Sequence, residues 1–117
     1  MKGDFSSQIL TKVLDLTAAR QRVLSHNLAN INTPGFVRSD LDFSQALADA
    51  VRGGPKNLAY MDLEPLKDEA SPARFDGNNV QLETELAEMS KNALMFQMAI
   101  QAMNARMSMM RTAITGR

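Results

Sequence analysis

The chain of 117 residues is long enough for one domain, and its 13 basic side chains balance its 13 acidic ones. This balance argues against nucleic acid or an anionic membrane surface as the main partner. The absence of cysteine excludes disulfides, thiolate metal sites and cysteine catalysis. Charged residues interrupt the first 30 positions, so we expect neither a secretory signal peptide nor a membrane span.

The first helix-forming pattern of the chain covers the N-terminal residues 5–31. Two adjacent apolar stripes with alternating steps of four and three residues form a wide face, which becomes polar at Arg20, Gln21, Asn27 and Asn30. Two interpretations of these polar positions stay open. They face solvent at a fraying helix end, or they hydrogen-bond across a helix–helix or subunit interface and fix its register.

The middle segment, 32–78, begins with a turn. Thr33-Pro34-Gly35-Phe36 has proline at the second and glycine at the third position, the signature of a type II turn. A short amphipathic helix over 43–51 follows and ends at Gly53-Gly54-Pro55. From residue 56 onwards the pattern dissolves, with one short strand expected at 58–61, and segments of this composition are usually mobile.

The strongest pattern is a heptad repeat in the C-terminal third, where apolar residues recur in steps of four and three without a break. This period of 3.5 predicts a long helix over 79–115, with Asn79 as its N-cap and Gly116 as its stop. Glutamates near its start and arginines near its end complement the helix dipole. The heptad seam consists of Leu82, Leu86, Met89, Ala93, Phe96, Ile100, Met103, Met107, Met110 and Ile114.

The regular helical patterns lie at the two ends of the chain, which favours pairing of the terminal helices. We therefore predict an all-α fold, one single domain over 1–117. Its long N- and C-terminal helices pair as an antiparallel coiled-coil-like hairpin, and its middle is irregular and partly mobile.

A hairpin alone leaves apolar surface without a partner. Burying one side chain of the size of leucine or methionine is worth roughly 1.5–3 kcal/mol, and long exposed apolar patches mark association surfaces. We expect the C-terminal helix to face its own N-terminal helix with the heptad seam and a neighbouring subunit with a second stripe. That stripe consists of Met95, Met98, Ala102, Ala105 and Met109.

Residues that could carry chemistry are few. His26 is the one histidine, and its sequence neighbours on a helix point in other directions. Thioethers suit Cu(I), but Met103, Met107 and Met110 fall on heptad positions where core methionine is expected. We predict no catalytic residue, no metal and no cofactor.

Two stretches of the sequence resemble the bacterial flagellar axial proteins. An Asn-rich helix end followed by Thr-Pro-Gly and an aromatic, over 25–36, is similar to the N-terminal signature of rod, hook and hook-associated proteins. The stretch 77–83, continued by 88–89 and 91–94, looks like the C-terminal signature of the proximal rod proteins. The resemblance covers roughly 9–43 and 76–114. Its motif residues are Asn27, Asn30, Thr33, Pro34, Gly35, Phe36, Gly77, Asn78 and Asn79.

The resemblance implies a structural subunit without enzymatic activity, whose terminal helices pack against those of neighbours in the helical, tubular axis of the basal body. It implies export by the flagellar type III apparatus without a cleaved signal peptide, and a location in the periplasmic rod. Implied partners are other rod proteins and the junction of MS ring and export apparatus, in homo- and hetero-oligomers, with no nucleic acid and no direct membrane span. The expected assembly interface combines the heptad seam with Met95 and Met98.

Two points stay open at this stage. The segments 5–9 and 43–47 both fit a Phe-x-x-x-apolar form that the export gate reads in some axial proteins, and core packing explains them about as well. The alternative function, from a different class, is a soluble helical adaptor or export chaperone that binds one partner helix.

Overall fold

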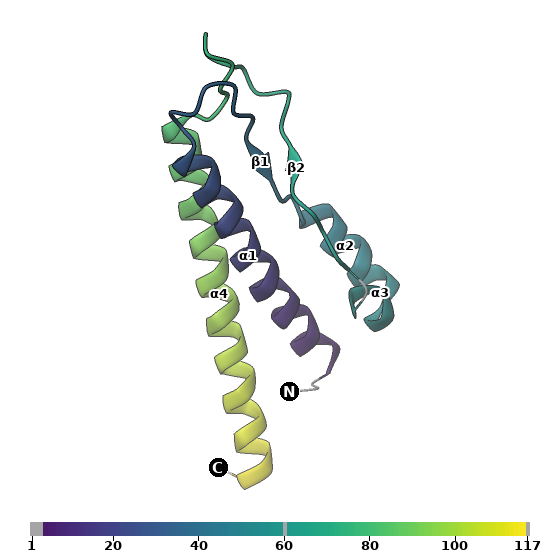
Figure 1. Cartoon of the computed structure of the whole chain (residues 1–117). Coiled ribbons are helices and arrows are strands. Elements are labelled where there is room, and N and C mark those ends of the chain that lie inside the picture. Colours follow the sequence, from purple (N-terminus) through teal and green to yellow (C-terminus); the bar gives the residue numbers. More distant parts are fainter. Residues whose placement is uncertain (1–3, 60, 117) are drawn as a thin grey trace.

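Two long helices form the body of the molecule, α1 (Phe5–Ala29) and α4 (Leu82–Thr115), and they lie side by side in antiparallel directions (Figure 1). The computed structural model describes residues 4–59 and 61–116, and the molecule is elongated, with extents of 64 × 28 × 16 Å. The predicted helical hairpin is confirmed.

The first helix starts and stops where its flanking residues can satisfy the free backbone groups. Asp4 is the N-cap, and its carboxylate accepts a hydrogen bond of 3.0 Å from the Ser7 N–H. At the other end the Thr33 carbonyl accepts from the Phe36 N–H at 3.2 Å, and Gly35 has φ +74°. These are the features of the predicted type II turn.

The start of α4 differs from the prediction. Its N-cap is Gln81, which makes no capping bond through its side chain, and not Asn79. Asn79 lies two residues before this cap and is buried, and its side chain is used elsewhere, as described below. The predicted stop is confirmed, since Gly116 takes the left-handed conformation with φ +73° and its N–H donates to the Thr112 carbonyl at 2.8 Å.

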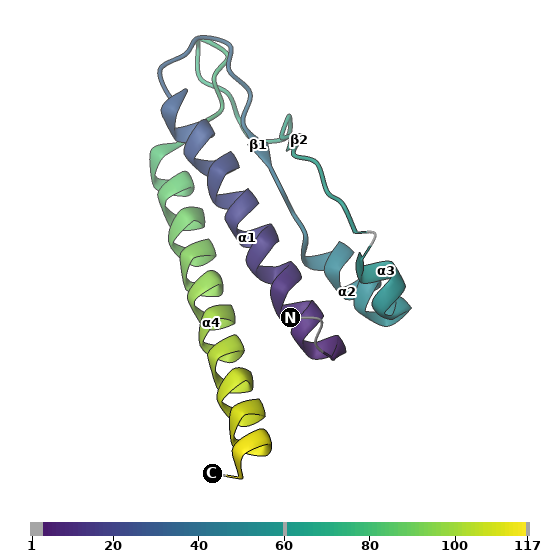
Figure 2. The same ribbon diagram turned by 60° about the horizontal axis from the view of Figure 1, so that its bottom comes forward.

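The middle segment packs on the side of α1 that faces away from α4 (Figures 1 and 2). It consists of β1 (Ser39–Asp40), α2 (Ser44–Gly53), α3 (Pro55–Ala59) and β2 (Leu66–Lys67), with irregular connections. The two strands pair antiparallel, Ser39 with Lys67 and Asp40 with Leu66. A small core joins this segment to α1 through Leu16, Leu41 and Phe43, with Ala19, Leu47, Met61 and Leu63 packed around them.

The strand predicted at 58–61 is wrong. Pro55 opens the short helix α3 instead, and the Leu58 N–H donates to the Gly54 carbonyl at 3.2 Å. Proline is well placed at the first position of a helix, where its missing N–H has no partner to lose. Tyr60, within the predicted strand, lies outside the described residues. The mobility expected of the middle segment stays a prediction.

The contact between α1 and α4 runs along a different stripe of α4 from the predicted one. The residues of α4 buried in the hairpin are Glu85, Asn92 and Ala99, spaced seven apart. From the heptad seam only Met89, Phe96 and Met103 are partly buried. The other large seam residues are between 37% and 83% exposed: Leu82, Leu86, Ile100, Met107, Met110 and Ile114. The stripe of α4 that contacts α1 is therefore rotated by about one residue from the predicted heptad seam, toward a polar stripe.

None of the helices in the described part of the chain combines the length and the apolar composition that crossing a membrane requires.

Candidate functional site

The two sequence motifs meet at one end of the hairpin, where the turn after α1 lies against the segment before α4. The Gly35 N–H donates to the Asp76 carbonyl at 2.7 Å, and the Asn79 N–H donates to the Phe36 carbonyl at 3.3 Å. We call this end of the molecule the joint. It is formed by residues 30–36 and 74–80, which are separated in the sequence by the whole segment 37–73.

Asn78 holds the joint together and is fully buried. Its Nδ2 donates to three backbone carbonyls of the turn, those of Asn30 (2.9 Å), Ile31 (3.1 Å) and Thr33 (2.8 Å). Its Oδ1 accepts from the Val80 N–H at 2.8 Å. One side chain thus ties three carbonyls of the turn after α1 to the segment before α4.

The glycines of the two motifs lie face to face in the joint. Gly35 and Gly77 have φ of +74° and +84°, a region that side chains with a Cβ rarely adopt. A Cβ on Gly77 would lie 3.3 Å from the Gly35 Cα, whereas one on Gly35 would meet nothing within 4 Å. The close approach therefore constrains Gly77 more than Gly35.

Directly below the joint, Arg38 binds three carboxylates that come from three parts of the chain. It donates through Nε to Glu85 of α4 (2.5 Å), through Nη1 to Asp68 (2.9 Å) and through Nη2 to Asp40 of β1 (3.2 Å). Asn79 adds to this cluster, because its Oδ1 accepts from the Arg38 N–H at 2.7 Å and its Nδ2 donates to the Asp68 carbonyl at 2.6 Å.

The pKa values in this cluster favour the charged forms. Burial lowers the pKa of Arg38, but its bonds to Glu85 and Asp68 raise it more, so that it stays above its ordinary value. A hydrogen bond from the Ser71 hydroxyl and the bond from Arg38 lower the pKa of Asp68 to about 2. A guanidinium with several carboxylates is how a charge is tolerated inside a protein.

Arg20 extends the cluster along α1. Its guanidinium bonds Asp40 at 2.9 Å through Nε and Glu88 of α4 at 2.7 Å through Nη2. Burial raises the pKa of Asp40 and Arg20 lowers it, with a net value below the ordinary one, while the bond from Arg20 lowers the pKa of Glu88. The charged residues thus connect α1, β1 and α4.

Three of the four polar positions, Arg20, Gln21 and Asn27, follow the second of the two interpretations within the chain. The Asn30 side chain bonds locally at the end of α1 instead, donating to the His26 carbonyl at 2.9 Å. Asn27 is fully buried and exchanges two hydrogen bonds with the backbone of Ser39, at 2.7 and 2.9 Å, while its Nδ2 also reaches Glu85 at 3.3 Å. Arg20 and Gln21 bond Glu88 and Asn92 of α4. These residues hold a helix–helix contact and do not face solvent at a frayed end.

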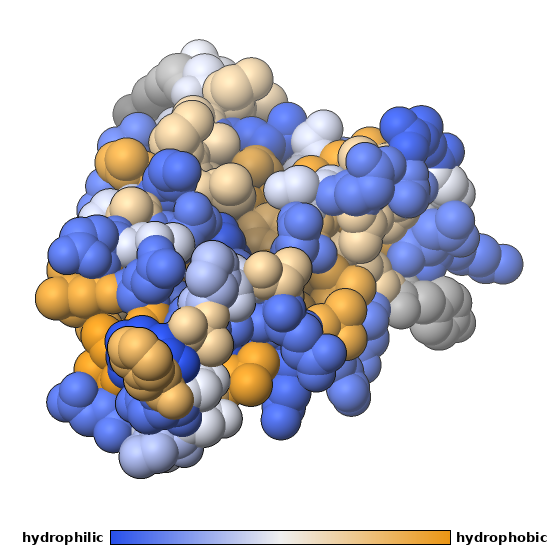
Figure 3. Space-filling view, turned by 90° about the horizontal axis from the view of Figure 1, so that it is seen from above, coloured by the Kyte–Doolittle hydropathy of each residue, from blue (hydrophilic) through white to orange (hydrophobic). Residues whose placement is uncertain are grey.

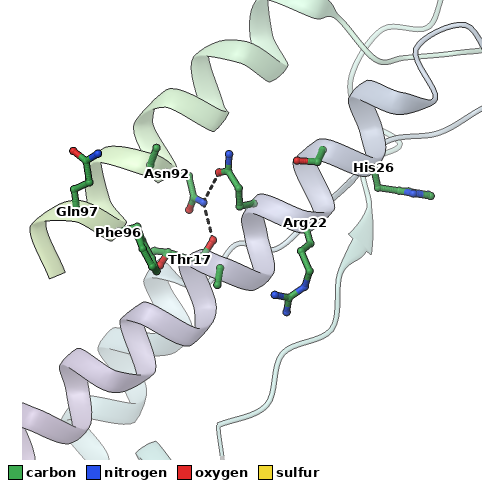
Figure 4. A pocket seen from close by; sticks show the side chains of 10 residues that line it. Thr17, Arg22, His26, Asn92, Phe96 and Gln97 are labelled. Carbon is green, nitrogen blue, oxygen red and sulfur yellow. Dashed lines mark hydrogen bonds between the residues drawn. The ribbon is translucent and has the colours of Figure 1, made fainter. Parts of the chain in front are cut away.

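Between α1 and α4, below the joint, lies an open groove of about 700 Å³ (Figure 4). Asn92 closes its floor, donating to the Thr17 carbonyl (2.7 Å) and to the Gln21 side chain (2.9 Å). The Oδ1 of Asn92 is buried and has no hydrogen-bond partner. Phe96 and Gln97 of α4 line the groove opposite Arg22 and His26 of α1.

His26 is exposed and sits at the edge of the joint. Its ring meets that of Phe36 edge to face, with centroids 5.7 Å apart and planes at 61°. Such a contact supports the position of the turn.

Most of the apolar side chains of α4 that α1 does not cover fall on two faces and one end, and Leu94, which is 60% exposed, lies outside these three sets. We call one set the leucine face, which consists of Leu82, Leu86, Ala93 and Ile100 and borders the groove through Ala93. We call the other set the methionine face, which consists of Met95, Met98 and Met109. Through Met95 it borders a second hollow beside Arg20 and Phe43. Beyond Arg106, which bonds Asp4 and Ser7 at the start of α1, α4 continues past α1 as an exposed end segment (Figures 1 and 2). The end segment carries Met107, Met110, Arg111 and Ile114 around a shallow hollow of about 470 Å³. A view from above shows apolar patches among the polar ones at the surface (Figure 3).

The structure thus gathers the motif residues of both chain ends, except Asn27, into the joint. Of the predicted interface residues, Met89, Phe96 and Met103 are partly buried, and the others lie on the two faces of α4 and its end. Sequence reasoning missed Arg38 and Glu85. It also missed Arg74, whose guanidinium donates to the Val80 carbonyl at 2.7 Å and to the Ile31 carbonyl within the joint. The spacing of seven from Glu85 through Asn92 and Ala99 to Arg106 was the signal for the rotated seam. Nothing in the pattern singles out Arg38, because its three carboxylate partners come from separate parts of the chain.

The sequence is similar to known proteins of one family. The sequence model of a family described as flagella basal body rod protein matches residues 14–36, which run from α1 into the joint. A flagellar basal body rod protein FlgB of Aeromonas hydrophila is 32% identical, over 88% of this chain and 87% of the relative. The FlgB proteins of Escherichia coli strain K12 and Bacillus subtilis strain 168 are 27% and 24% identical, over 90% and 93% of this chain. The chain therefore belongs to the FlgB family of flagellar basal body rod proteins.

Proposed function

We propose that this chain, a structural subunit of the flagellar basal-body rod, assembles into the rod through the leucine face and the methionine face of α4. Family membership implies association with other components of the rod. We further propose that like and unlike subunits form a helical array and that this chain lies next to the junction of MS ring and export apparatus. We also propose that it is exported through the type III apparatus and lies in the periplasmic part of the rod.

One observation carries the proposal. In α4 the apolar side chains are not confined to the stripe that α1 covers, since Leu82, Leu86 and Ile100 on one side and Met95, Met98 and Met109 on the other are all more than a third exposed. A helix that is apolar on most sides is stable only when neighbours cover it. Methionine tolerates neighbours of different shape, which suits contacts with unlike subunits.

The joint and the charged cluster explain how a subunit can expose so much apolar surface and keep its form. Asn78 and Arg38 fix the two helices to each other and to the middle segment by hydrogen bonds rather than by a large core. The apolar residues of α4 then remain for contacts between subunits.

The test compares one aspartate on each face with a matched control. Ile100→Asp and Met98→Asp each place a charge on one face, and Gln101→Asp places it on the exposed surface between them. We expect each of the first two variants to abolish self-association in sedimentation velocity and to abolish motility when it replaces the natural chain. Their monomers keep the wild-type helix content, and the control assembles normally.

This design separates the rod subunit from the adaptor. A protein that binds one partner helix needs only one of the two faces. Normal assembly of either Ile100→Asp or Met98→Asp would therefore contradict the proposal, and a chain that stays monomeric at every concentration would favour the adaptor.

A further inference from the structure

The groove between α1 and α4 contains a polar atom that the subunit leaves without a partner. Asn92 is 2% exposed, and its Nδ2 uses both hydrogens in the bonds to Thr17 and Gln21 (Figure 4). Its Oδ1 is closed to water and accepts no hydrogen bond from the described residues. A buried carbonyl oxygen without a donor costs free energy, so a donor that reaches this atom stabilises whatever complex supplies it.

A charge beside this atom also lacks a partner. Arg22 lines the groove from α1 and is exposed, and within the described part of the chain its guanidinium makes no ion pair and no hydrogen bond. Arg20, two residues earlier, is held by Asp40 and Glu88. The groove therefore lacks two things that a partner could bring, a hydrogen-bond donor and an anion.

The walls of the groove favour a helix as its occupant. Helices α1 and α4 pair their own backbone groups, so the groove offers few backbone donors or acceptors to an extended segment. A helix arrives with its backbone groups already paired and can lay one face between two side-by-side helices. Ala18, Ala93 and Phe96 offer apolar contacts to such a face.

The positions of the two unpartnered groups specify the chemistry of that helix. Asn92 bonds Thr17 and Gln21, and Arg22 follows Gln21, so the two groups are about one helical turn apart along α1. The occupant therefore needs a donor side chain and a carboxylate three or four residues apart on an otherwise apolar face. The donor reaches Asn92 Oδ1 after a small shift of the side chains that close it.

The helices of this chain do not offer such a face. Their exposed acids, among the residues that the structure describes, are Asp15, Asp49 and Glu83. Asp49 is paired with Arg52, and Asp15 has no large apolar side chain one turn before or after it. One turn beyond Glu83 are a leucine and an alanine, which donate no hydrogen bond. These observations favour a different protein as the occupant.

We propose that the groove binds an amphipathic helix of an unlike subunit, whose donor side chain bonds Asn92 Oδ1 and whose carboxylate pairs with Arg22. The inference rests on the proposed function, because Ala93 in the α4 wall belongs to the leucine face. It assigns the part of that face beside the groove to an unlike subunit and not to a copy of this chain.

Photo-cross-linking in intact basal bodies identifies the occupant. A benzophenone amino acid replaces either Ser25 on the α1 wall or Gln97 on the α4 wall, both of which are exposed. We expect both positions to cross-link to one helical segment of an unlike rod protein, located by mass spectrometry. The matched control, Gln45 on α2, is exposed and lies on the far side of α1, and it should not react with that segment.

Three results of this experiment would overturn the proposal. They are cross-links to a second copy of this chain, cross-links to no protein, and cross-links to a segment without an acid and a donor one turn apart.

A charge exchange tests the ion pair. Arg22→Glu should leave the urea midpoint of the monomer unchanged, because Arg22 is exposed and bonds no described residue. It should lower the cross-linking yield at Gln97 about fivefold, since a pair is lost and a repulsion gained. Arginine in place of the partner's carboxylate residue should restore the yield. Lys56→Glu, at an exposed position of α3, is the control and should keep the full yield. An undiminished yield in Arg22→Glu, or no recovery in the exchange, would contradict the pairing.

The hydrogen bond to Asn92 has a signature of its own. Protein labelled with carbon-13 at asparagine is titrated with a synthetic peptide of the cross-linked segment. The side-chain carbonyl signal of Asn92 should move downfield as Oδ1 gains its donor. A peptide with alanine in place of the donor should bind about three- to tenfold more weakly and leave that signal in place. Equal affinities of the two peptides would overturn the contact with Asn92.

These outcomes differ from those that decide the proposed function. Loss of assembly in Ile100→Asp and Met98→Asp, without cross-links from Ser25 and Gln97, would overturn the groove contact and leave the proposed function intact. Normal assembly of either aspartate variant, together with these cross-links, would contradict the proposed function and keep the groove contact.

Discussion

At the scale of single residues, amide side chains do much of the work that apolar cores do in other small proteins. Asn27, Asn78 and Asn79 are all buried, and each bonds the backbone of a segment distant in sequence. An amide offers donors and an acceptor on one short side chain, so it can satisfy both kinds of backbone group at a chain crossing. Asn78 and Asn79 thus hold the joint, and Asn27 fixes β1 to α1.

Replacing Asn78 by aspartate should destabilise the fold although the shape is preserved. The variant keeps the acceptor for the Val80 N–H but turns an oxygen toward three backbone carbonyls. We expect a loss of about 3 kcal/mol in the free energy of unfolding, measured by urea denaturation of the monomer. Asn104→Ala, at an exposed position of α4, should change it by less than about 0.5 kcal/mol. A wild-type midpoint for Asn78→Asp would show that the joint does not limit stability.

The two glycines of the joint should respond unequally to alanine. Gly35→Ala meets only the strain of a positive φ, about 1–2 kcal/mol, because its Cβ has open space. Gly77→Ala meets the same strain and also pushes against the Gly35 Cα at 3.3 Å. Thermal unfolding of the two variants should rank Gly77→Ala as the less stable, and the reverse order would mean that the two chain segments separate easily.

At the scale of the elements, the sequence predicts the helices better than the way they meet. The unbroken period of 3.5 reveals α4, and the Thr-Pro-Gly turn ends the N-terminal helix within two residues of the prediction. The face of α4 that meets α1 was mistaken, because the rule that the most apolar stripe is buried ignores polar pairs. Glu85 and Asn92 can lie in the contact between α1 and α4 because other residues bond them there. Arg38 and Asn27 bond Glu85, and Thr17 and Gln21 bond Asn92.

The same reason explains the error at the start of α4. Asn79 has the right chemistry for an N-cap, but Arg38 and Asp68 occupy its side chain. Partners that are distant in sequence leave no trace in local periodicity. The candidate interface was in part predictable, since a second apolar stripe on α4 is visible in the sequence.

The charged cluster should make the link between the elements sensitive to acid. The pKa of Asp68 is lowered from 3.8 to about 2 in the folded chain. A lowered pKa contributes stability above the unfolded value, and the contribution is lost as the pH falls through the folded one. We therefore expect the urea midpoint to hold above about pH 4 and to drop between pH 4 and pH 2. Asp68→Asn should be less stable near neutral pH and show a shallower drop, and an equally steep drop would assign the acid sensitivity to other groups.

At the scale of the whole molecule, the two ends are built for different tasks. The joint end concentrates nearly all long-range hydrogen bonds of the described motif residues, whereas the end segment of α4 projects past α1 with every residue from 107 to 116 exposed. A helix end without a partner frays in water, so the end segment gains most when another subunit covers it. We therefore expect the subunit to hold its form at the joint and to gain a partner for the end segment on assembly.

Removing residues 107–117 should separate folding from assembly. Among the described residues, the hydrogen bonds of α4 with the start of α1 end at Arg106, which bonds Asp4 and Ser7, so we expect the shortened chain to keep the hairpin. We expect the free energy of unfolding of the monomer to change by less than about 1 kcal/mol. Sedimentation velocity should show no oligomers at concentrations where the full chain assembles. The matched control, Ser108→Ala/Thr112→Ala, alters exposed polar residues of the same segment and should assemble normally. A shortened chain that fails to fold would show that the end segment stabilises its own hairpin, and one that assembles like the full chain would remove it from the interface.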